Sequence, residues 1–387
     1  MRHSRLVIPA GPVIPAEQRP VLLAVDGNSL VHRSFHAHAH TGARSPDGAP
    51  VWAVRGFLGQ LVRAVQRVGA RAVVVGFDDH TRNVRKARWP EYKATRIAKP
   101  GELVVQLART VALLRAAGLH VVVAPGLEAD DVVASAARTA TTAGWDTVVV
   151  TSDRDAFALV SDTTRVLRLI TGGVDASPLL TPQRLHTLTG VRPHQYREFA
   201  ALRGDTSDNL DGVRGIGVKT AARLLSELAT VAQALAEPER AAQAVGRVAA
   251  ARLSTPQARG AFTRNIELMT PVDDVDLELD LVGAGAGCLP LPERPLRDAL
   301  AAAGLVSSER SAVHALCDAP PEEPALGVDS AGVRWLMSDT AHLDLLVSLA
   351  ERADQPARAR APARGAPVRA SVRASARAPE PAQGTLF

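Results

Sequence analysis

Short apolar runs alternate with longer stretches of helical periodicity over the first half of the chain. Runs of this length, bounded by turn residues, predict buried strands. These strands are expected at residues 21–25, 71–77, 120–124 and 147–150. Between them, helical periodicity occurs over residues 52–68 and 102–117 and in a segment opening at Glu128. Strands that alternate with helices predict an α/β fold with a parallel sheet covered on both faces.

The pattern becomes helical, with short breaks, after about Thr181. Helices are expected at residues 181–188 and 194–202, and another follows a glycine-rich turn at 212–217. Further helices are expected up to about Leu316. Residues 320–324 are typical of a linker, and 327–352 favour one amphipathic helix without an assigned role.

These patterns divide the chain into four parts. Residues 1–19 are expected to be a flexible leader. They do not resemble a signal peptide, because they lack a continuous apolar core. The sheet occupies residues 20–200 and a helical region 201–318. Residues 319–387 form a linker and a mostly disordered basic tail, since Ala, Arg and Pro dominate after Gln355.

Composition narrows the class of protein. With 46% hydrophobic residues among 387, the chain can bury a sizeable core. Its two cysteines, Cys288 and Cys317, lack metal-type spacing, which argues against a disulfide framework or zinc site and favours a reducing, cytoplasmic compartment. No apolar run approaches the ~20 residues that span a bilayer, so no membrane association is expected. Nothing in the pattern indicates an oligomer, and a monomer is expected.

The formal charge of +5 is concentrated locally. Between Arg82 and Lys99 stand seven Lys and Arg residues against Glu91 alone, with Trp89 and Tyr92 among them. Cations suit a polyanionic substrate, and aromatic rings can stack on unpaired bases. The alternatives are a solvated basic loop and a tryptophan that anchors packing.

Acidic residues gather where the predicted strands end or helices begin. That edge is where an open α/β sheet builds its site. So many carboxylates in one cleft need cations to neutralise them, and oxygen ligands select Mg²⁺ or Mn²⁺. The alternative for each cluster is a structural role, such as helix capping. The nine candidate ligands are Asp26, Asp78, Glu128, Asp130, Asp131, Asp153, Asp155, Asp205 and Asp208.

The glycine-rich turn at residues 215–221 has two functional interpretations. A P-loop is excluded because the lysine does not directly follow the last glycine and no strand precedes the turn. A helix–hairpin–helix turn fits better, since its glycines let a phosphate approach the N–H groups that start the next helix. A plain helix connection is the alternative.

Several motifs occur together and in order: Asp26-Gly-Asn, Phe77-Asp78, Pro90-Glu-Tyr-Lys93, Glu128-Ala-Asp-Asp131, Thr151-Ser-Asp-Arg-Asp155, Gly204-Asp-Thr-Ser-Asp-Asn209 and Gly215-Ile-Gly-Val-Lys-Thr220. In these motifs the chain resembles the 5′-nuclease domain of bacterial DNA polymerase I and its stand-alone flap endonuclease relatives. The resemblance covers about Val21 to Leu316, and no polymerase domain follows, so a stand-alone member is expected.

The resemblance implies a PIN-like parallel sheet, a helical arch at about residues 80–100 and a C-terminal helix–hairpin–helix region. It implies that Asp26, Asp78 and the Glu128, Asp130, Asp131 cluster hold one ion. A second ion would be held by Asp153, Asp155, Asp205 and Asp208. Lys93 and Arg85 would act on the scissile phosphate. The implied DNA contacts are Arg33, Tyr92, Arg96, Gly215, Gly217, Lys219 and Thr220, with K⁺ at the hairpin turn.

The last five residues form another candidate motif. An apolar pair ending a polar tail is typical of a tethered binding motif. The end resembles the pentapeptide by which bacterial replication proteins bind the sliding clamp, which implies clamp contacts through Gln383, Leu386 and Phe387.

The expected function is a structure-specific 5′ nuclease that cleaves DNA at a 5′ flap, nick or free 5′ end by a two-metal-ion reaction. It would act in replication and repair, in the cytoplasm at the nucleoid. Two alternatives stay open. One is a PIN-type ribonuclease, and the other is a non-catalytic module that tethers DNA to a clamp.

Overall fold

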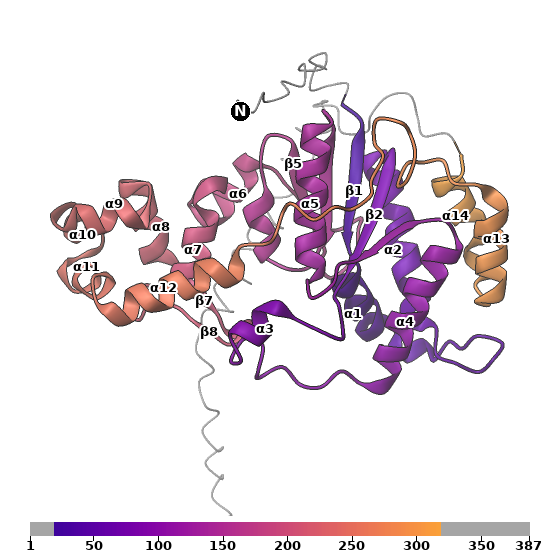
Figure 1. Cartoon of the computed structure of the whole chain (residues 1–387), viewed down its shortest axis with the longest axis horizontal. Helices are drawn as coiled ribbons and strands as arrows, with labels where there is room; N and C mark the ends of the chain where they lie inside the picture. The colour runs from indigo at the N-terminus through magenta and orange to yellow at the C-terminus, as the bar shows by residue number, and fades with distance from the viewer. Residues whose placement is uncertain (1–18, 319–387) are drawn as a thin grey trace, which may run out of the picture.

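A six-stranded sheet lies at the centre of the computed structural model, which describes residues 19–318 (Figure 1). The strand order is β3-β2-β1-β4-β5-β6, and every neighbouring pair is parallel except β5 and β6. The strands are β1 Val21–Asp26, β2 Ala72–Phe77, β3 His120–Val123, β4 Asp146–Thr151, β5 Thr164–Arg168 and β6 Leu179–Leu180. The predicted parallel sheet is confirmed. The last two strands were not anticipated, because β5 mixes polar and apolar residues and β6 is only two residues long.

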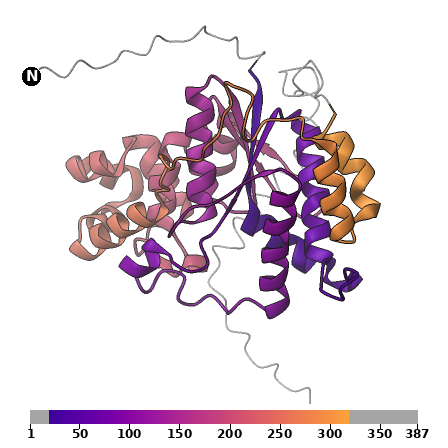
Figure 2. The ribbon, with the colours of Figure 1, turned by 45° about the vertical axis from the view of Figure 1, so that its right-hand side comes forward.

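Both faces of the sheet are covered, which explains why the central strands β1 and β2 are largely apolar. Val21, Leu23 and Val25 of β1 point toward one core, while Leu22 and Ala24 point toward the other. Helices α1 Gly27–His38, α2 Trp52–Val68 and α4 Gly101–Ala116 cover the first face, and α5 Ala129–Thr142 covers the second. Figure 2 shows α5 lying across the sheet.

Strand register brings the polar strand ends to one edge. Val25 of β1 lies opposite Val75 of β2 and Val150 of β4, so these three strands finish at the same level. Close packing of α5 on β2 depends on Gly76, where an added Cβ would lie 2.7 Å from the Val132 Cβ. The helix that begins at Glu128 is thereby held directly above that edge.

The predicted helical arch is helical only in α3, Val84–Arg88. Trp89 leaves the helical region because Pro90 follows it, and Lys93 has φ 56°. The remaining residues up to Pro100 form turns and irregular chain. We refer to residues 80–100 as the basic segment.

Beyond β6 the chain builds a helical lobe, seen at the left of Figure 1. Its helices are α6 Pro182–Thr189, α7 Tyr196–Arg203, α8 Val218–Leu228, α9 Val231–Ala236, α10 Pro238–Val245, α11 Arg247–Leu253 and α12 Pro256–Met269. A short hairpin, β7 Gly204–Asp205 and β8 Leu210–Asp211, connects α7 to α8. Tyr196, Phe199 and Leu224 of the lobe share one core with Val132 of α5, so lobe and sheet pack directly together.

The expectation of helices with only short breaks up to about Leu316 needs correction. Residues 271–292 contain no helix and run back across the sheet, where Val73 N–H donates to the Gly287 carbonyl at 2.7 Å. The last helices, α13 Glu293–Ala302 and α14 Glu309–Leu316, then pack on α4 and α2 rather than on the lobe (Figure 2). The reason is hydrophobic: Leu296, Leu300 and Leu316 are buried in the core under α2.

Five short 3₁₀ helices complete the described elements: η2 Ala39–Thr41, η3 Asp155–Leu159, η4 Pro193–Gln195, η5 Thr206–Asp208 and η6 Val306–Ser308. Within residues 19–318, no helix combines the length and the apolar character needed to cross a bilayer. The predicted leader at 1–18, the linker at 320–324, the amphipathic helix at 327–352, the basic tail and the terminal pentapeptide lie outside the described residues.

Candidate active site

A cavity of ≈ 520 Å³ opens at the carboxyl ends of β1, β2 and β4. Six of the predicted ligands line it: Asp26, Asp78, Glu128, Asp130, Asp153 and Asp205. Asp155 and Asp208 lie next to it, within electrostatic range of Asp205, while Asp131 faces elsewhere. Folding therefore gathers acidic residues that are spread over about half of the chain.

The two strand-end aspartates are held by hydrogen bonds. Asp26 caps α1 by accepting from Ser29 N–H at 2.9 Å, and its other oxygen accepts from the Thr151 hydroxyl at 2.8 Å. Asp78 accepts from the Asn28 amide at 2.7 Å and from Ala129 N–H at 2.9 Å. Asn28 and Thr151 were not among the predicted site residues, although both occur in the quoted motifs.

Burial and crowding weaken the acidity of three carboxyl groups. Burial, with Asp78 and Asp153 adding repulsion, raises the pKa of Asp26 to about 7. Burial and the charges of Asp153 and Asp26 raise the pKa of Asp130 well above its ordinary value. The pKa of Asp155 is raised likewise, by burial and by Asp153, and its Oδ1 is buried without a hydrogen-bond partner. Such a set favours a cation that would allow all members to ionise.

Lys93 pairs with two carboxyl groups of the site. Its Nζ lies 2.7 Å from Glu128 Oε1 and 3.9 Å from Asp208 Oδ2. Burial opposes the charge of Glu128, yet Lys93 and Arg85 outweigh it and lower the pKa of that carboxyl. The lysine backbone is held as well, because Lys93 N–H donates to the Asp208 carbonyl at 2.9 Å. Lys93 therefore lines the cavity.

The helical lobe contributes the last acidic pair. Asp205 and Asp208 lie in the β7–β8 hairpin, and Asp205 caps η5 by accepting from Ser207 N–H at 2.8 Å. Asp208 forms an ion pair with Arg96. Burial raises the pKa of Asp208 despite Lys93 and Arg96. The basic segment is thus fastened to the entrance of the lobe, above the cavity.

Two assigned residues occupy a different place from the one predicted. The Arg85 guanidinium grips Asp131 through two nitrogens, at 2.7 and 2.6 Å, and also donates to the Leu268 and Thr270 carbonyls at 3.1 Å. Asp131, fully buried, accepts from the backbone N–H groups of Glu128 and Val272 as well. All its oxygens are engaged, so we correct both assignments: in this geometry Asp131 is no metal ligand and Arg85 is not placed to touch a phosphate.

Tyr92 also departs from its predicted role. Its side chain is 4% exposed, and its hydroxyl donates to Glu128 Oε2 at 3.1 Å. A ring buried in this way is not placed to stack on a base, so the DNA contact assigned to Tyr92 is corrected. Trp89 is partly buried against the same core, as its alternative interpretation held.

The hairpin turn of the lobe lies outside the cavity. Gly215 has φ +83°, Gly217 caps α8, and both are exposed together with Lys219, whereas Ile216 is buried between them. Thr220 follows in the first turn of α8. The turn therefore presents backbone N–H groups at a helix start, the geometry that suits a phosphate. Arg33 lies on α1, beside the cavity rather than in its lining.

The residues fit a divalent cation in chemistry, but their present spacing does not form a finished site. The lining offers six carboxyl groups together with the His32 imidazole, and one buried oxygen of Asp155 has no partner. Within residues 19–318, however, no three acidic, His or Cys side chains stand close enough to share one ion. Lys93 and Arg96 neutralise Glu128 and Asp208 instead.

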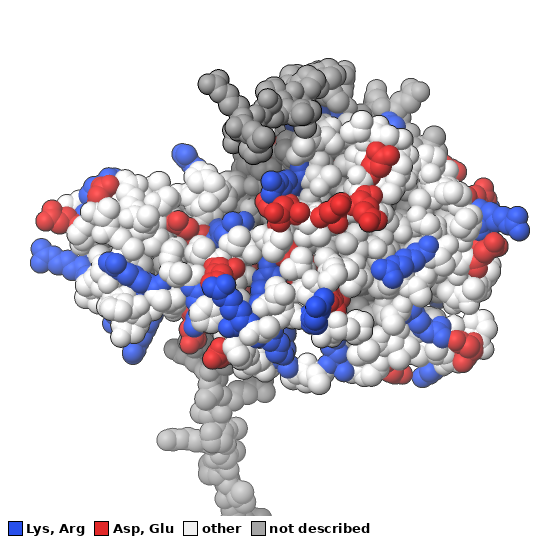
Figure 3. All heavy atoms as spheres, in the orientation of Figure 1, with Lys and Arg blue, Asp and Glu red and all other residues white. Residues whose placement is uncertain are grey.

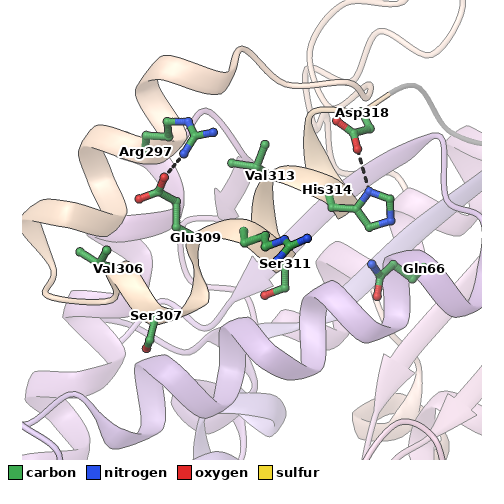
Figure 4. A pocket seen from close by; sticks show the side chains of 10 residues that line it. Gln66, Arg297, Val306, Ser307, Glu309, Ser311, Val313, His314 and Asp318 are labelled. Carbon is green, nitrogen blue, oxygen red and sulfur yellow. Dashed lines mark hydrogen bonds and ion pairs between the residues drawn. The ribbon is translucent and has the colours of Figure 1, made fainter.

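Basic and acidic side chains also lie close together on the surface near the cavity. Figure 3 shows Lys and Arg side chains gathered over α3 and the turn behind it, beside acidic ones. A larger hollow of ≈ 860 Å³ lies elsewhere, between α2 and the α13–α14 pair (Figure 4). There Arg297 pairs with Glu309, and His314 with Asp318 at 2.7 Å. Its acidic side chains are thus already paired, and the carboxylate cavity remains the better candidate.

Two family models match the chain. The 5′-3′ exonuclease N-terminal resolvase-like domain matches residues 21–188, and the 5′-3′ exonuclease C-terminal SAM fold matches residues 191–285. Together they span more than half of the chain.

Curated relatives agree with these models. DNA polymerase I of Mycobacterium bovis is 37% identical over 265 residues, which cover 68% of this chain and 28% of that protein. Thermostable DNA polymerase I of Thermus thermophilus is 40% identical over 211 residues, or 54% of this chain and 24% of the relative. The match thus spans only about a quarter of the length of these polymerases.

Solved structures share the fold at low identity. T5 5′-exonuclease with bound zinc has a TM-score of 0.51 and 17% identity, covering 77% of this chain and all of that one. The catalytic core of Rad2 in complex with a DNA substrate has a TM-score of 0.50 and 17% identity, with 80% and 95% covered.

Proposed function

Since the chain belongs to the 5′-3′ exonuclease family, we propose that it is a structure-specific 5′ nuclease that hydrolyses DNA phosphodiesters near 5′ ends. The substrates are a 5′ flap, a nick or a free 5′ end. The observation that carries this proposal is the cavity at the strand ends, where six carboxylates meet beneath a basic segment. A pure DNA-binding module gains nothing from concentrated negative charge beside a phosphate.

Divalent cations, Mg²⁺ or Mn²⁺, complete this site. Asp26, Asp78, Glu128 and Asp130 would hold one ion, and Asp153, Asp155, Asp205 and Asp208 a second, after side-chain movements that bring the oxygens of each set closer together. Such ions supply Lewis-acid polarisation of the phosphodiester and activation of water. The Lys93 ammonium, which pairs with Glu128 at 2.7 Å, would supply the positive charge for the phosphate.

The remaining side chains bind and orient the strand. Lys93 offsets the negative charge that builds on the scissile phosphate during hydrolysis. Arg96 and Lys99, both at the cavity mouth, attract the neighbouring backbone. The exposed turn of Gly215 and Gly217 with Lys219 and Thr220 grips the duplex by its phosphates, with K⁺ as a candidate ion there.

Cleavage of a labelled 5′ flap in Mg²⁺, with EDTA as the control, tests the function. Asp130→Ala and Asp153→Ala should retain duplex binding and lose most cleavage. Wild-type turnover in both variants would remove the site assignment. Cleavage of matched RNA in the same assay tests the ribonuclease alternative. A ribonuclease would share the carboxylates but would not need a turn that binds duplex DNA.

The sequence of the last five residues supports a second contact, with the sliding clamp. Deleting residues 383–387 should abolish clamp pull-down and leave flap cleavage unchanged. Undiminished pull-down by the shortened chain would eliminate this part of the proposal.

A further inference from the structure

Three arginines cluster on the β5 side of the carboxylate cavity. Arg168 ends β5, directly opposite Thr151 of β4, whose hydroxyl donates to Asp26. Arg154 stands between Asp153 and Asp155 and lines the cavity. Arg33 comes from α1 and reaches the Leu169 carbonyl at 3.5 Å, one residue beyond Arg168. The cluster is therefore one strand away from the acidic residues.

These guanidinium groups are poorly neutralised. Within residues 19–318, none of the three has a carboxylate within ion-pair distance, and the side chains of Arg154 and Arg168 donate no hydrogen bond. The Arg168 Nε is buried without a partner, and its guanidinium lies 5.7 Å from the centre of the Phe157 ring. By contrast, Arg85 in the same molecule is paired with Asp131.

The lowered pKa values of two of these arginines also favour binding of an anion. Burial lowers the pKa of Arg168 to about 10, and repulsion from Arg154 and Arg33 adds to this, against attraction from Tyr196 and Asp153. Burial also lowers the pKa of Arg33. Half-buried cations that repel one another need an anion, and the planar guanidinium fork matches a phosphate.

We propose that Arg33, Arg154 and Arg168 form a second phosphate-binding subsite, which holds a phosphate group of the strand being cut. This inference rests on the proposed nuclease function. A strand whose scissile phosphate lies at the acidic residues brings its neighbouring phosphate toward the β5 side. A 5′-terminal phosphate is the better ligand there, because its monoester carries more negative charge than an internal diester.

Binding measured in EDTA tests the subsite without cleavage. The probe is a fluorescein-labelled nicked duplex carrying either a 5′-phosphate or a 5′-hydroxyl at the nick. Arg154→Gln and Arg168→Gln should each weaken binding of the phosphorylated duplex by about tenfold, the effect of losing a charge-assisted hydrogen bond. The matched control is Arg138→Gln on α5, an exposed arginine paired with Asp273, which should stay within about twofold of wild type.

The two probes distinguish the sources of the phosphate. A loss confined to the phosphorylated nick identifies the terminal group, and an equal loss on both identifies an internal diester. Arg168→Lys, which keeps the charge but not the fork, should restore part of the affinity and covers the case in which Arg168→Gln does not fold. With Mg²⁺ and saturating DNA, Arg154→Gln should change KM rather than kcat.

Unchanged binding of both duplexes by folded Arg154→Gln and Arg168→Gln would overturn the subsite. That result is separate from failure of the proposed function, which would appear as wild-type protein that binds DNA but does not cut a flap in Mg²⁺.

Discussion

Neighbouring residues at the start of α5 show how side-chain environment separates similar carboxylates. Asp131 is enclosed by Arg85 and two backbone N–H groups, and all its lone pairs are engaged. Asp130, one residue earlier, lines the cavity, where burial and the charges of Asp153 and Asp26 raise its pKa. Both residues are aspartates at neighbouring positions of the same motif. The partners differ, and so does the role.

Asp26→Asn tests whether burial and repulsion raise the pKa of Asp26. The folded-state pKa of Asp26 is about 7, above its ordinary 3.8, so its ionisation destabilises the fold as pH rises from about 4 to 7. Removing the charge should therefore stabilise the metal-free protein at pH 8, by about 2–3 kcal/mol more than at pH 5. Thermal unfolding in EDTA at the two pH values measures this.

Asp131→Asn is the contrasting variant. It breaks the buried ion pair with Arg85 and should lower the melting temperature at both pH values. If Asp26→Asn gave the same stability gain at pH 5 as at pH 8, the pKa of Asp26 would not be raised.

Among the secondary-structure elements, the ends of strands and helices do most to build the site. The register of β1, β2 and β4 sets three strand ends side by side, and α5 begins above them. The basic segment is tied to this frame at both ends, through Arg85 near its start and through Arg96 near its finish. Its position over the cavity thus depends on ion pairs rather than on helical structure.

Arg85→Met tests whether this arginine joins elements or acts on substrate. The change leaves Asp131 buried without its cation and should cost about 3–5 kcal/mol of unfolding free energy. The control is Arg82→Met, an exposed residue 3.9 Å from Asp79, which should change stability by less than about 0.5 kcal/mol. Urea unfolding compares the two. Wild-type stability combined with lost cleavage in Arg85→Met would instead support the catalytic role that the sequence suggested.

At the scale of the whole molecule, the chain leaves the sheet to build the helical lobe and later returns to it. It leaves the sheet for the helical lobe after β6 and returns through residues 271–292 to place α13 and α14 against α2 and α4 (Figure 1). The lobe brings Asp205 and Asp208 to the cavity, and the returning helices complete the core on the opposite side.

Leu300→Ala tests the contribution of this return. Leu300 is fully buried in the core beneath α2, so its truncation should cost about 2–5 kcal/mol. Val306, 59% exposed in the adjoining turn, provides the control, and Val306→Ala should have little effect. Equal unfolding midpoints for the two variants would mean that α13 adds no stability to the sheet.

Local pattern determined the sheet, most helices and the acidic residues of the site. Continuous apolar runs identify β1, β2, β3 and β4, because the middle of a strand covered on both faces is largely apolar. The acidic residues at the strand ends were found for the same reason, since a carboxylate directly after a buried strand stands out. β5 was not predicted from the sequence, because its polar residues alternate with apolar ones.

Partner choice was decided only in three dimensions. Asp131 and Tyr92 lie in the same motifs as cavity residues, and Arg85 lies in the same basic segment as Lys93, yet each is turned inward by groups 36 to 185 residues away. The same holds for the cluster of Arg33, Arg154 and Arg168, which no spacing reveals. Sequence records which charges a chain possesses, whereas burial and long-range contacts determine which of them remain unpaired and able to meet a substrate.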